Sequence, residues 1–320
     1  MPSPRRGRME EVMPKLHLPF VLGALTVIAA GAGAASAPST EQAAGAGEKK
    51  TFRWVGCGIT KKAFMKELAA AYERKTGVRI EIEGGGATRG IREVVAGKAD
   101  IGGSCRGLIT GNPKEMGADL RPVAWDALVV IVHPDNPVED ITLDQIRGLY
   151  LGKIRNWKEL GGNDAPIRLY VRRGKISGVG RAIRKLVFAD YDVDFKAYKV
   201  VKSSGPLEKA VEKDVNAVGI TGISSARKRK VKILKLEGKE PSFDNIRKGE
   251  YLLYRPLYLV LNPAHPQYAE LEKFIKFAHS SEGRRVIRAN RTVPYLEALR
   301  LVMKEVEQEK RARERGLYRR

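Results

Sequence analysis

The sequence contains little of what marks several common classes of protein. Cysteine accounts for only two of the 320 residues, which excludes a disulfide-rich scaffold. The spacing of His133, His265 and His279 does not fit a metal site. The sequence also lacks helix-turn-helix patterns, aromatic-interleaved basic strips, internal repeats and coiled-coil heptads. We therefore expect no metal, no cofactor and no nucleic-acid partner.

Acidic residues are also scarce. The chain has 37 Asp and Glu against 59 Lys and Arg, which gives a net charge of +22. Such a balance favours anionic partners, although a basic, solvated surface accounts for many of these charges equally well. The hydrophobic fraction of 43% and the length of the chain suffice for two ordinary domains with real cores.

The N-terminal segment lacks an apolar run long enough to span a membrane comfortably. Instead, Lys15 precedes a short apolar stretch at 18–30, and small residues follow as far as Ala37. This order is typical of a secretory signal peptide, so we expect residues 1–37 to be removed on export to the periplasm. Removing four basic and two acidic residues would lower the net charge from +22 to +20. Residues 38–50 are expected to form a flexible linker.

Glycine-rich loops lead into expected helices at three places. They are Gly56-Cys57-Gly58-Ile59-Thr60, Gly84-Gly85-Gly86-Ala87-Thr88 and Arg173-Gly174-Lys175-Ile176-Ser177-Gly178-Val179. Such a loop brings free backbone N–H groups and the positive end of a helix dipole to one point. The third loop adds a fixed positive charge. We therefore predict that an oxyanion is held between these loops.

Strand and helix periodicities alternate along the chain. The expected strands are 51–55, 78–82, 99–103, 127–132, 167–171, 217–221 and 257–261. The expected helices are 60–75, with Thr60 as N-cap, then 88–96, 143–151, 178–188, 268–278 and 282–290. The basic segment 227–239 is expected to form a strand with a turn at a solvated edge, and 297–320 a charged helix or tail. This alternation predicts an α/β fold with a largely parallel sheet.

Five short segments resemble, in the same order, the PstS family of phosphate-binding proteins from bacterial ABC importers. The segments are 64–69 with 75–77, 99–103, 132–138, 152–162 and 255–258. The resemblance extends over about 52–296 and implies the type II periplasmic-binding-protein fold, in which two α/β lobes are joined by two crossing strands and the ligand lies in the cleft. By this resemblance, 52–126 and 255–296 form lobe one, and 127–254 form lobe two.

The resemblance also implies a function and a set of ligand contacts. It implies a monomeric, non-enzymatic receptor that delivers inorganic phosphate or a related oxyanion to the membrane permease of an ABC importer. The implied contact residues are Thr60, Lys61, Ala87, Thr88, Cys105, Arg106, Arg173, Ser177, Gly178 and Val179. Arg173 is expected to be the ion-pairing residue, with Arg172 and Arg106 as alternatives.

The chain departs from the family pattern at three places. Ala87 stands where many members have serine, and Val179 replaces a threonine. The segment Ser104-Cys105-Arg106 lies where well-studied members carry an aspartate that accepts the phosphate proton and other members carry Ser-Arg. Without a carboxylate there, the pocket is expected to discriminate less against a fully ionised oxyanion, and Arg106 to add bidentate donors.

The family topology further implies that Cys57 and Cys105 end neighbouring strands. In an oxidising compartment they could form a disulfide, with two separate buried thiols as the alternative. Two other functions also remain open. One is an oxyanion sensor or scaffold without a transport role. The other is a secreted phosphatase-type hydrolase, with Ser177 or a thiol as nucleophile.

Overall fold

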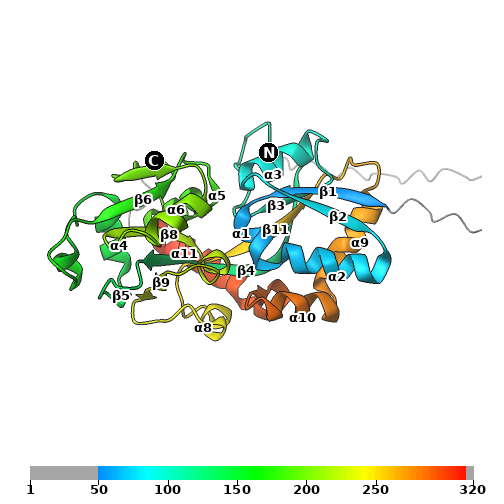
Figure 1. Ribbon diagram of the computed structural model, residues 1–320. Coiled ribbons are helices and arrows are strands. Elements are labelled where there is room, and N and C mark those ends of the chain that lie inside the picture. Colours follow the sequence, from blue (N-terminus) through cyan, green and yellow to red (C-terminus); the bar gives the residue numbers. More distant parts are fainter. Residues whose placement is uncertain (1–49, 315–320) are drawn as a thin grey trace, which may run out of the picture. The chain divides into compact units, whose positions relative to one another are not determined.

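The computed structural model describes residues 50–314 (Figure 1). The predicted signal peptide and almost all of the predicted linker lie outside the described residues. The described residues all belong to one compact unit of the chain. Within them, no helix combines the length and the apolar character needed to cross a bilayer.

The strands and helices alternate through most of the described chain. The strands are β1 Thr51–Gly56, β2 Arg79–Gly84, β3 Ile101–Ser104, β4 Asp119–Val132, β5 Asp140–Ile141, β6 Arg168–Arg172, β7 Lys199–Val201, β8 Ala217–Gly222, β9 Lys232–Ile233, β10 Lys235–Leu236, β11 Tyr254–Leu261 and β12 Val293–Pro294. The α-helices are α1 Gly58–Thr60, α2 Lys66–Thr76, α3 Ala87–Val95, α4 Leu143–Tyr150, α5 Gly178–Ile183, α6 Ser204–Val211, α7 Ile223–Ala226, α8 Phe243–Lys248, α9 Tyr268–His279, α10 Ser281–Ala289 and α11 Arg300–Glu314. Turns of π-helix extend α1 through Lys61–Met65 and α5 through Arg184–Phe188, and turns of 3-10 helix form at Trp157–Leu160 and Tyr295–Ala298.

The principal sheet has the order β2-β1-β3-β11-β4-β8-β6-β7. Its outer strands pair in parallel at both ends, β2-β1-β3 on one side and β8-β6-β7 on the other. In the middle, β11 and β4 pair antiparallel with each other and with their neighbours β3 and β8. The predicted parallel pairing therefore holds for the outer strands, whereas the central strands return in the opposite direction.

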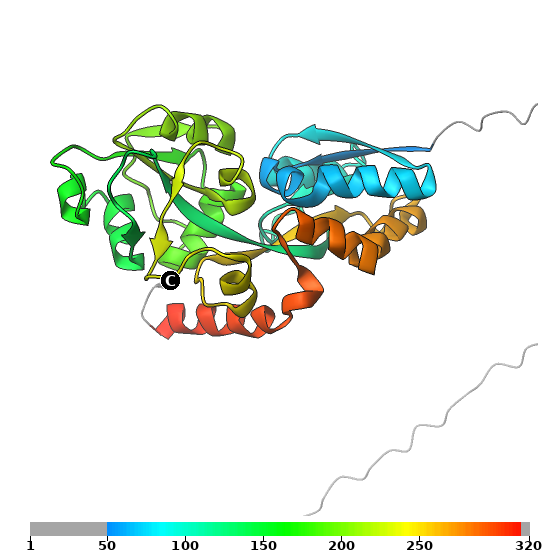
Figure 2. The ribbon, with the colours of Figure 1, turned by 60° about the horizontal axis from the view of Figure 1, so that its bottom comes forward.

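The long strand β4 belongs to both halves of the molecule. Its N-terminal part pairs with β11, and its C-terminal part, from Leu128 to Val132, pairs with β8 (Figure 2). We call the part built on β1, β2, β3, α1–α3, α9 and α10 the first lobe, and the part built on β6, β7, β8, α4–α8 and α11 the second lobe. Strands β4 and β11 are the connection between the lobes.

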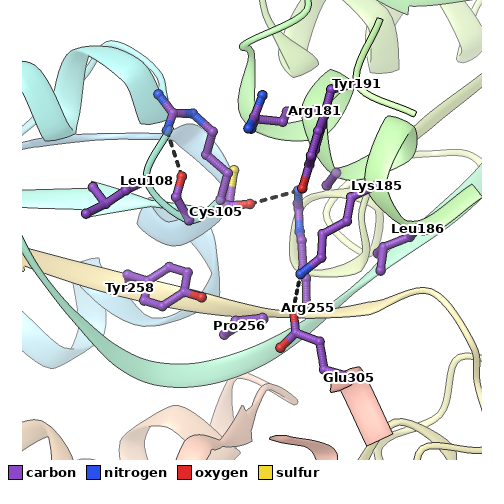
Figure 3. A pocket seen from close by; sticks show the side chains of 13 residues that line it. Cys105, Leu108, Arg181, Lys185, Leu186, Tyr191, Arg255, Pro256, Tyr258 and Glu305 are labelled. Carbon is purple, nitrogen blue, oxygen red and sulfur yellow. Dashed lines mark hydrogen bonds and ion pairs between the residues drawn. The ribbon is translucent and has the colours of Figure 1, made fainter. Parts of the chain in front are cut away.

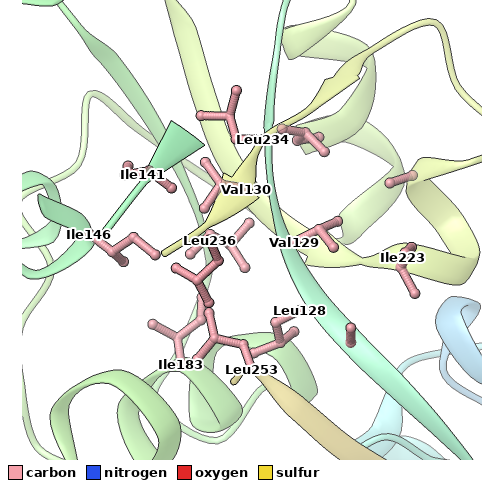
Figure 4. Close-up of a cluster of buried hydrophobic side chains, with 14 of the residues drawn as sticks. Leu128, Val129, Val130, Ile141, Ile146, Ile183, Ile223, Leu234, Leu236 and Leu253 are labelled. Carbon is pink, nitrogen blue, oxygen red and sulfur yellow. The ribbon is translucent and has the colours of Figure 1, made fainter. Parts of the chain in front are cut away.

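Each lobe has its own hydrophobic core. In the first lobe, alternation along β1 places Trp54 in a core on one face of the sheet and Val55 in a smaller one beneath α3 on the other. In the second lobe, the apolar run of β4 packs against side chains from several helices and turns (Figure 4). Leu301 of α11 is fully buried in this second core. The residue bounds predicted for the lobes remain a prediction.

Several local predictions need correction. The first helix begins at Gly58 rather than after Thr60, and Cys57 is its N-cap, with its Sγ accepting the Thr60 N–H at 3.3 Å. The strand with a turn predicted at 227–239 is reduced to two two-residue strands, β9, which pairs with β4, and β10, which pairs with β5. The helix, one of the two alternatives predicted for the C-terminal segment, does form, as α11, and Glu305 ties it to the second lobe with its carboxylate 2.6 Å from Lys185 Nζ.

Candidate anion-binding site

A cavity of about 600 Å³ lies between the two lobes. Most of its wall consists of the loops at which strands end and helices begin, the position where ligands bind in α/β sheets. Its lining residues are Cys57, Gly58, Ile59, Lys62, Gly84, Gly85, Gly86, Ala87, Cys105, Arg172, Arg173, Gly178, Val179, Lys202, Ser203, Ser204, Gly205, Ser225 and Arg229. Among the described residues, no aspartate or glutamate lines this cavity.

The wall from the first lobe is made mainly of backbone. The Gly56 carbonyl accepts hydrogen bonds from Gly85 N–H at 2.9 Å and from Gly86 N–H at 3.1 Å, so the two glycine loops are tied together. Gly86 has a φ of +91°, which an L side chain rarely adopts, and it caps α3. Because these two N–H groups are already used, the donors that this wall can offer come from the first residues of α1 and α3.

The wall from the second lobe carries fixed positive charge. Arg172 ends β6 and is half-buried, and its Nη1 donates to Ser204 Oγ at 2.8 Å. Burial lowers the pKa of Arg172, and its Nε has no hydrogen-bond partner among the described residues. Arg173 and Lys202 are exposed. In the described part of the chain, no carboxylate comes within ion-pair distance of any of these three cations.

The buried carboxylate of Glu208 organises one side of the cavity. It lies 3.3 Å from Lys62 Nζ and 3.1 Å from Arg229 Nε. It also accepts hydrogen bonds from Ser225 Oγ at 2.5 Å and Thr221 Oγ1 at 2.8 Å. Glu208 itself does not line the cavity. It therefore positions Lys62 and Arg229 at the wall, and a second carboxylate, that of Glu212, lies 3.8 Å from Arg229 Nη1.

The two lobes touch each other at the inner end of the cavity. A Cβ built on Gly178 would lie 2.4 Å from Cys105 Sγ and 3.2 Å from Ala87 Cβ, so only glycine fits this contact. Arg255, from the connecting strand β11, donates from Nη1 to the carbonyls of Cys105 at 3.2 Å and Gly178 at 3.3 Å, one in each lobe. Its Nη2 lies 3.3 Å from Asp126 Oδ2, and both side chains are buried. Figure 3 shows Arg255 beside Cys105 in an adjoining cavity of about 160 Å³.

The two thiols lie in this region as free, buried cysteines. A hydrogen bond from Cys57, together with the guanidinium groups of Arg255 and Arg172, lowers the pKa of Cys105 to about 6. Burial raises the pKa of Cys57. The structure therefore brings the two cysteines together as predicted but without a covalent bond, and the disulfide remains a prediction.

The structure brings half of the sequence-predicted contact residues to the cavity. They are Ala87, Cys105, Arg173, Gly178 and Val179. Of these, only Arg173 carries a fixed charge. The remaining side chains are small or apolar, so their contribution would come through backbone N–H groups and close packing.

Thr60, Lys61 and Ser177 do not line the cavity. Thr60 is fully buried, and its Oγ1 lies 2.9 Å from Cys57 Sγ and 3.4 Å from the Ser104 carbonyl. Lys61 Nζ donates to the Ile82 carbonyl at 3.4 Å. Ser177 Oγ accepts the Gly180 N–H at 3.3 Å as the N-cap of α5. These side chains shape the loops.

The side chains of Thr88 and Arg106 likewise do not line the cavity. Arg106 was expected to offer bidentate donors to the anion, but it gives them to the buried carboxylate of Glu115, at 2.9 Å from Nη1 and 2.7 Å from Nη2. Its Nε donates to the Ile176 carbonyl across the cleft at 3.0 Å. Thr88 Oγ1 donates to the same carbonyl at 3.1 Å. Both side chains therefore join the lobes beside the cavity. Arg89 forms ion pairs with Glu83 and Glu93.

Sequence reasoning missed the start of α6 as part of the cavity. Lys202, Ser203, Ser204 and Gly205 follow β7 and line the wall, and Pro206 occupies the first turn of α6. A serine-glycine run after a short strand, with proline at a helix start, is a signal that could have found it. Lys62 and Arg229 carried no such signal, because their placement depends on the distant Glu208.

Comparison with known proteins agrees with this architecture. A family model described as a PBP superfamily domain matches residues 32–282. The chain belongs to the PBP superfamily. This PBP-superfamily protein is 29% identical over 252 residues to the phosphate-binding protein PstS of Bacillus subtilis (strain 168), an alignment that covers 75% of this chain and 81% of that protein.

Two solved structures resemble this PBP-superfamily protein along nearly their whole length. One, from Clostridium perfringens, is described as a phosphate ABC transporter substrate-binding protein with bound phosphate; it has a TM-score of 0.69 and 30% identity, and the match covers 77% of this chain and 99% of that one. The other is an ABC-type phosphate transport receptor from Vibrio cholerae, with a TM-score of 0.60, 28% identity, and coverage of 76% and 99%. The predicted PstS-like family and type II fold are thus confirmed.

Proposed function

We propose that this protein captures inorganic phosphate outside the cytoplasm and presents it to the permease of an ABC importer. The observation that carries the proposal is the cavity between the lobes, where helix starts meet Arg172, Arg173 and Lys202 and no described carboxylate lines the wall. Backbone N–H groups and guanidinium groups are the donors that tetrahedral oxyanions prefer. The names of the B. subtilis, C. perfringens and V. cholerae relatives support phosphate as the anion.

The contacts between the lobes suggest how capture works. Donors from both lobes converge on one cavity, so an anion bound there would hold the lobes together. Closure would also remove water from the anion and strengthen each charged hydrogen bond. The permease would then distinguish the ligand-bound, closed form from the open one. Export rests on the predicted signal peptide at 1–37.

We further propose that the protein binds without catalysis. Ser225 Oγ and Lys62 Nζ lie 2.6 Å apart at the cavity wall, which is the spacing of a serine–lysine catalytic pair. However, the Glu208 carboxylate contacts both groups, and a lysine acting as a base would have to give up that ion pair. Ser177 is equally unsuited to be a nucleophile, because its hydroxyl caps α5 and donates to the Gly174 carbonyl.

Isothermal titration of the mature protein with phosphate, sulfate, arsenate and molybdate tests the binding proposal. We expect saturable binding of one phosphate per chain. If no oxyanion gives heat or a thermal shift, the receptor function is wrong. If sulfate binds more tightly than phosphate, only the phosphate assignment is wrong.

The transport role is separable from binding. Phosphate-loaded protein should stimulate ATP hydrolysis by its permease and ATPase reconstituted in proteoliposomes. Arg172→Ala, which we expect to bind phosphate poorly, serves as the matched control at the same phosphate concentration. Tight phosphate binding without any stimulation would favour the sensor or scaffold role.

A further inference from the structure

Both cysteines of the chain line the cavity between the lobes. Cys57 and Cys105 follow the neighbouring parallel strands β1 and β3, and the Cys57 N–H donates to the Gly103 carbonyl at 3.0 Å. A hydrogen bond also joins the two thiol groups. The pairing of the two strands therefore brings two sulfur atoms together in the wall of the cavity that we propose for an oxyanion.

The sulfur of Cys105 lies at the contact between the two lobes. A Cβ built on Gly178 of the second lobe would lie 2.4 Å from Cys105 Sγ and 3.2 Å from Ala87 Cβ. All three residues line the cavity. An anion around which the lobes close is therefore brought up to the Cys105 sulfur, and a reaction between two groups held together in this way is strongly favoured.

The two thiols differ in their readiness to react. The hydrogen bond from Cys57 and the guanidinium groups of Arg255 and Arg172 lower the pKa of Cys105 to about 6, so its sulfur is mainly a thiolate at neutral pH. Burial raises the pKa of Cys57, which stays a thiol. The thiolate is the nucleophilic form of cysteine. Cys105 is thus suited to attack a bound ligand, and Cys57 to attack the Cys105 sulfur afterwards.

We infer that the reduced protein converts arsenate, bound in the cavity in place of phosphate, to arsenite and is itself oxidised to the Cys57–Cys105 disulfide. The inference rests on the proposed function, because arsenate has the shape and charge of phosphate and enters the same cavity. Thiols reduce arsenate, whereas they do not reduce phosphate or sulfate. Each chain reacts once, so the protein is a stoichiometric reductant and not a catalyst.

The first step joins sulfur to arsenic. The Cys105 thiolate attacks the arsenic of dihydrogen arsenate, so that an S–As bond forms and an As–O bond breaks. The departing hydroxyl group takes one proton from solvent and leaves as water. Arsenic stays in the As(V) state in this adduct. Arg172 lines the cavity, and its positive charge offsets the repulsion between the thiolate and the anion.

The second step transfers two electrons. Cys57 gives up its thiol proton, and its sulfur attacks the Cys105 sulfur, so that an S–S bond forms and the S–As bond breaks. The electron pair of the S–As bond stays on arsenic, which is reduced from As(V) to As(III) while the two sulfur atoms are oxidised. The proton from Cys57 and one more from solvent complete arsenous acid. This product is uncharged, so the cations of the cavity no longer retain it.

Mixing arsenate with the mature protein tests the inference, after the protein has been reduced, freed of reductant and kept without oxygen. We expect release of about one arsenite and loss of about two thiols per chain, with no further reaction. Chromatography of the arsenic species and thiol titration in denaturant measure both. If arsenate binds in a calorimetric titration but no arsenite forms, the inference is overturned while the proposed function stands. If neither arsenate nor orthophosphate binds, the proposed function is overturned and the inference with it.

Orthophosphate shows whether the reaction takes place in the cavity. At about ten times the arsenate concentration, it should slow arsenite release roughly tenfold, because the two anions compete for one site. Orthophosphate alone should leave both thiols intact. Arsenite release at an undiminished rate would place the reaction elsewhere and overturn the inference.

The unsubstituted chain also provides the matched control. Protein oxidised to the disulfide before arsenate is added should release no arsenite, and reduction followed by removal of the reductant should restore the reaction. Cys105→Ser should lose no thiol, and Cys57→Ser should release no arsenite, with circular dichroism showing that each variant is folded. Arsenite release from the oxidised protein or from folded Cys105→Ser would contradict the assigned roles of the two thiols.

Discussion

The two walls of the cavity offer different chemical groups to a ligand. The first lobe offers glycine loops, helix starts and two thiols, and Lys62 is its one basic lining residue among those described. The second lobe supplies Arg172, Arg173, Lys202 and Arg229. Backbone donors tied by hydrogen bonds form a rigid wall, whereas long basic side chains form an adaptable one. The first wall thus selects a shape, and the second supplies most of the attraction.

The largest expected effect concerns the rigidity of the first wall. If Cys57 and Cys105 form a disulfide after export, the bridge closes a loop of about fifty residues and adds about 3–4 kcal/mol to the free energy of unfolding. Urea unfolding with and without reductant measures this difference, and Cys57→Ser with Cys105→Ser should abolish it. Two reactive thiols in the denatured, unreduced protein would rule the bridge out.

The next largest effect concerns the charge of the second wall. Arg172→Ala should weaken phosphate binding by about 2–4 kcal/mol, because it removes a half-buried cation from the cavity. Arg168→Ala is the control, since Arg168 lies on the same strand but pairs with Asp214 at 3.1 Å away from the cavity. Titration of both variants should separate them. Equal affinities would show that the attraction does not depend on Arg172.

A steric change tests the contact between the walls. Gly178→Ala places a methyl group 2.4 Å from Cys105 Sγ, so it should oppose closure and cost about 1–3 kcal/mol of binding free energy. Adding Cys105→Ala removes the sulfur and should restore much of the affinity. If the double variant binds no better than Gly178→Ala, the loss has another cause than this contact.

The smallest expected effect is that of Arg173→Ala. Because Arg173 is exposed, salt should screen its charge, and we expect a loss of roughly three- to fivefold at low ionic strength that disappears in high salt. Titration at two salt concentrations measures this. A larger loss than that of Arg172→Ala would restore Arg173 as the ion-pairing residue that the sequence predicts.

The sequence predicted the glycine loops because their signal is local. Gly56 and Gly84 follow strands whose residues alternate, and helix periodicity resumes directly after each loop. The same local pattern could not decide between Arg172 and Arg173. Both line the cavity, but only Arg172 is half-buried, and which residue at the end of a strand is buried depends on how β6 sits in the sheet.

The misjudged role of Arg106 has a different cause. Its position after β3 was identified, but its partner Glu115 lies nine residues further along an irregular segment. Nothing in the spacing shows that this loop folds back and buries the carboxylate. Lys62 and Arg229 illustrate the same limit, because the Glu208 that holds them lies on another helix. Ion pairs between residues far apart in the sequence decide which cations face a ligand. The hydrophobic periodicity of the sequence does not reveal such pairs.

The contacts of Arg255 have a consequence for the rate of ligand exchange. Its guanidinium group bonds to the Cys105 carbonyl in one lobe and the Gly178 carbonyl in the other, so separating the lobes must break one of these bonds. A hydrogen bond from a charged group contributes about 1.5–3 kcal/mol. If that loss falls on the barrier to opening, opening slows by roughly one to two powers of ten. The residence time of a captured anion then depends on an arginine that does not line its cavity.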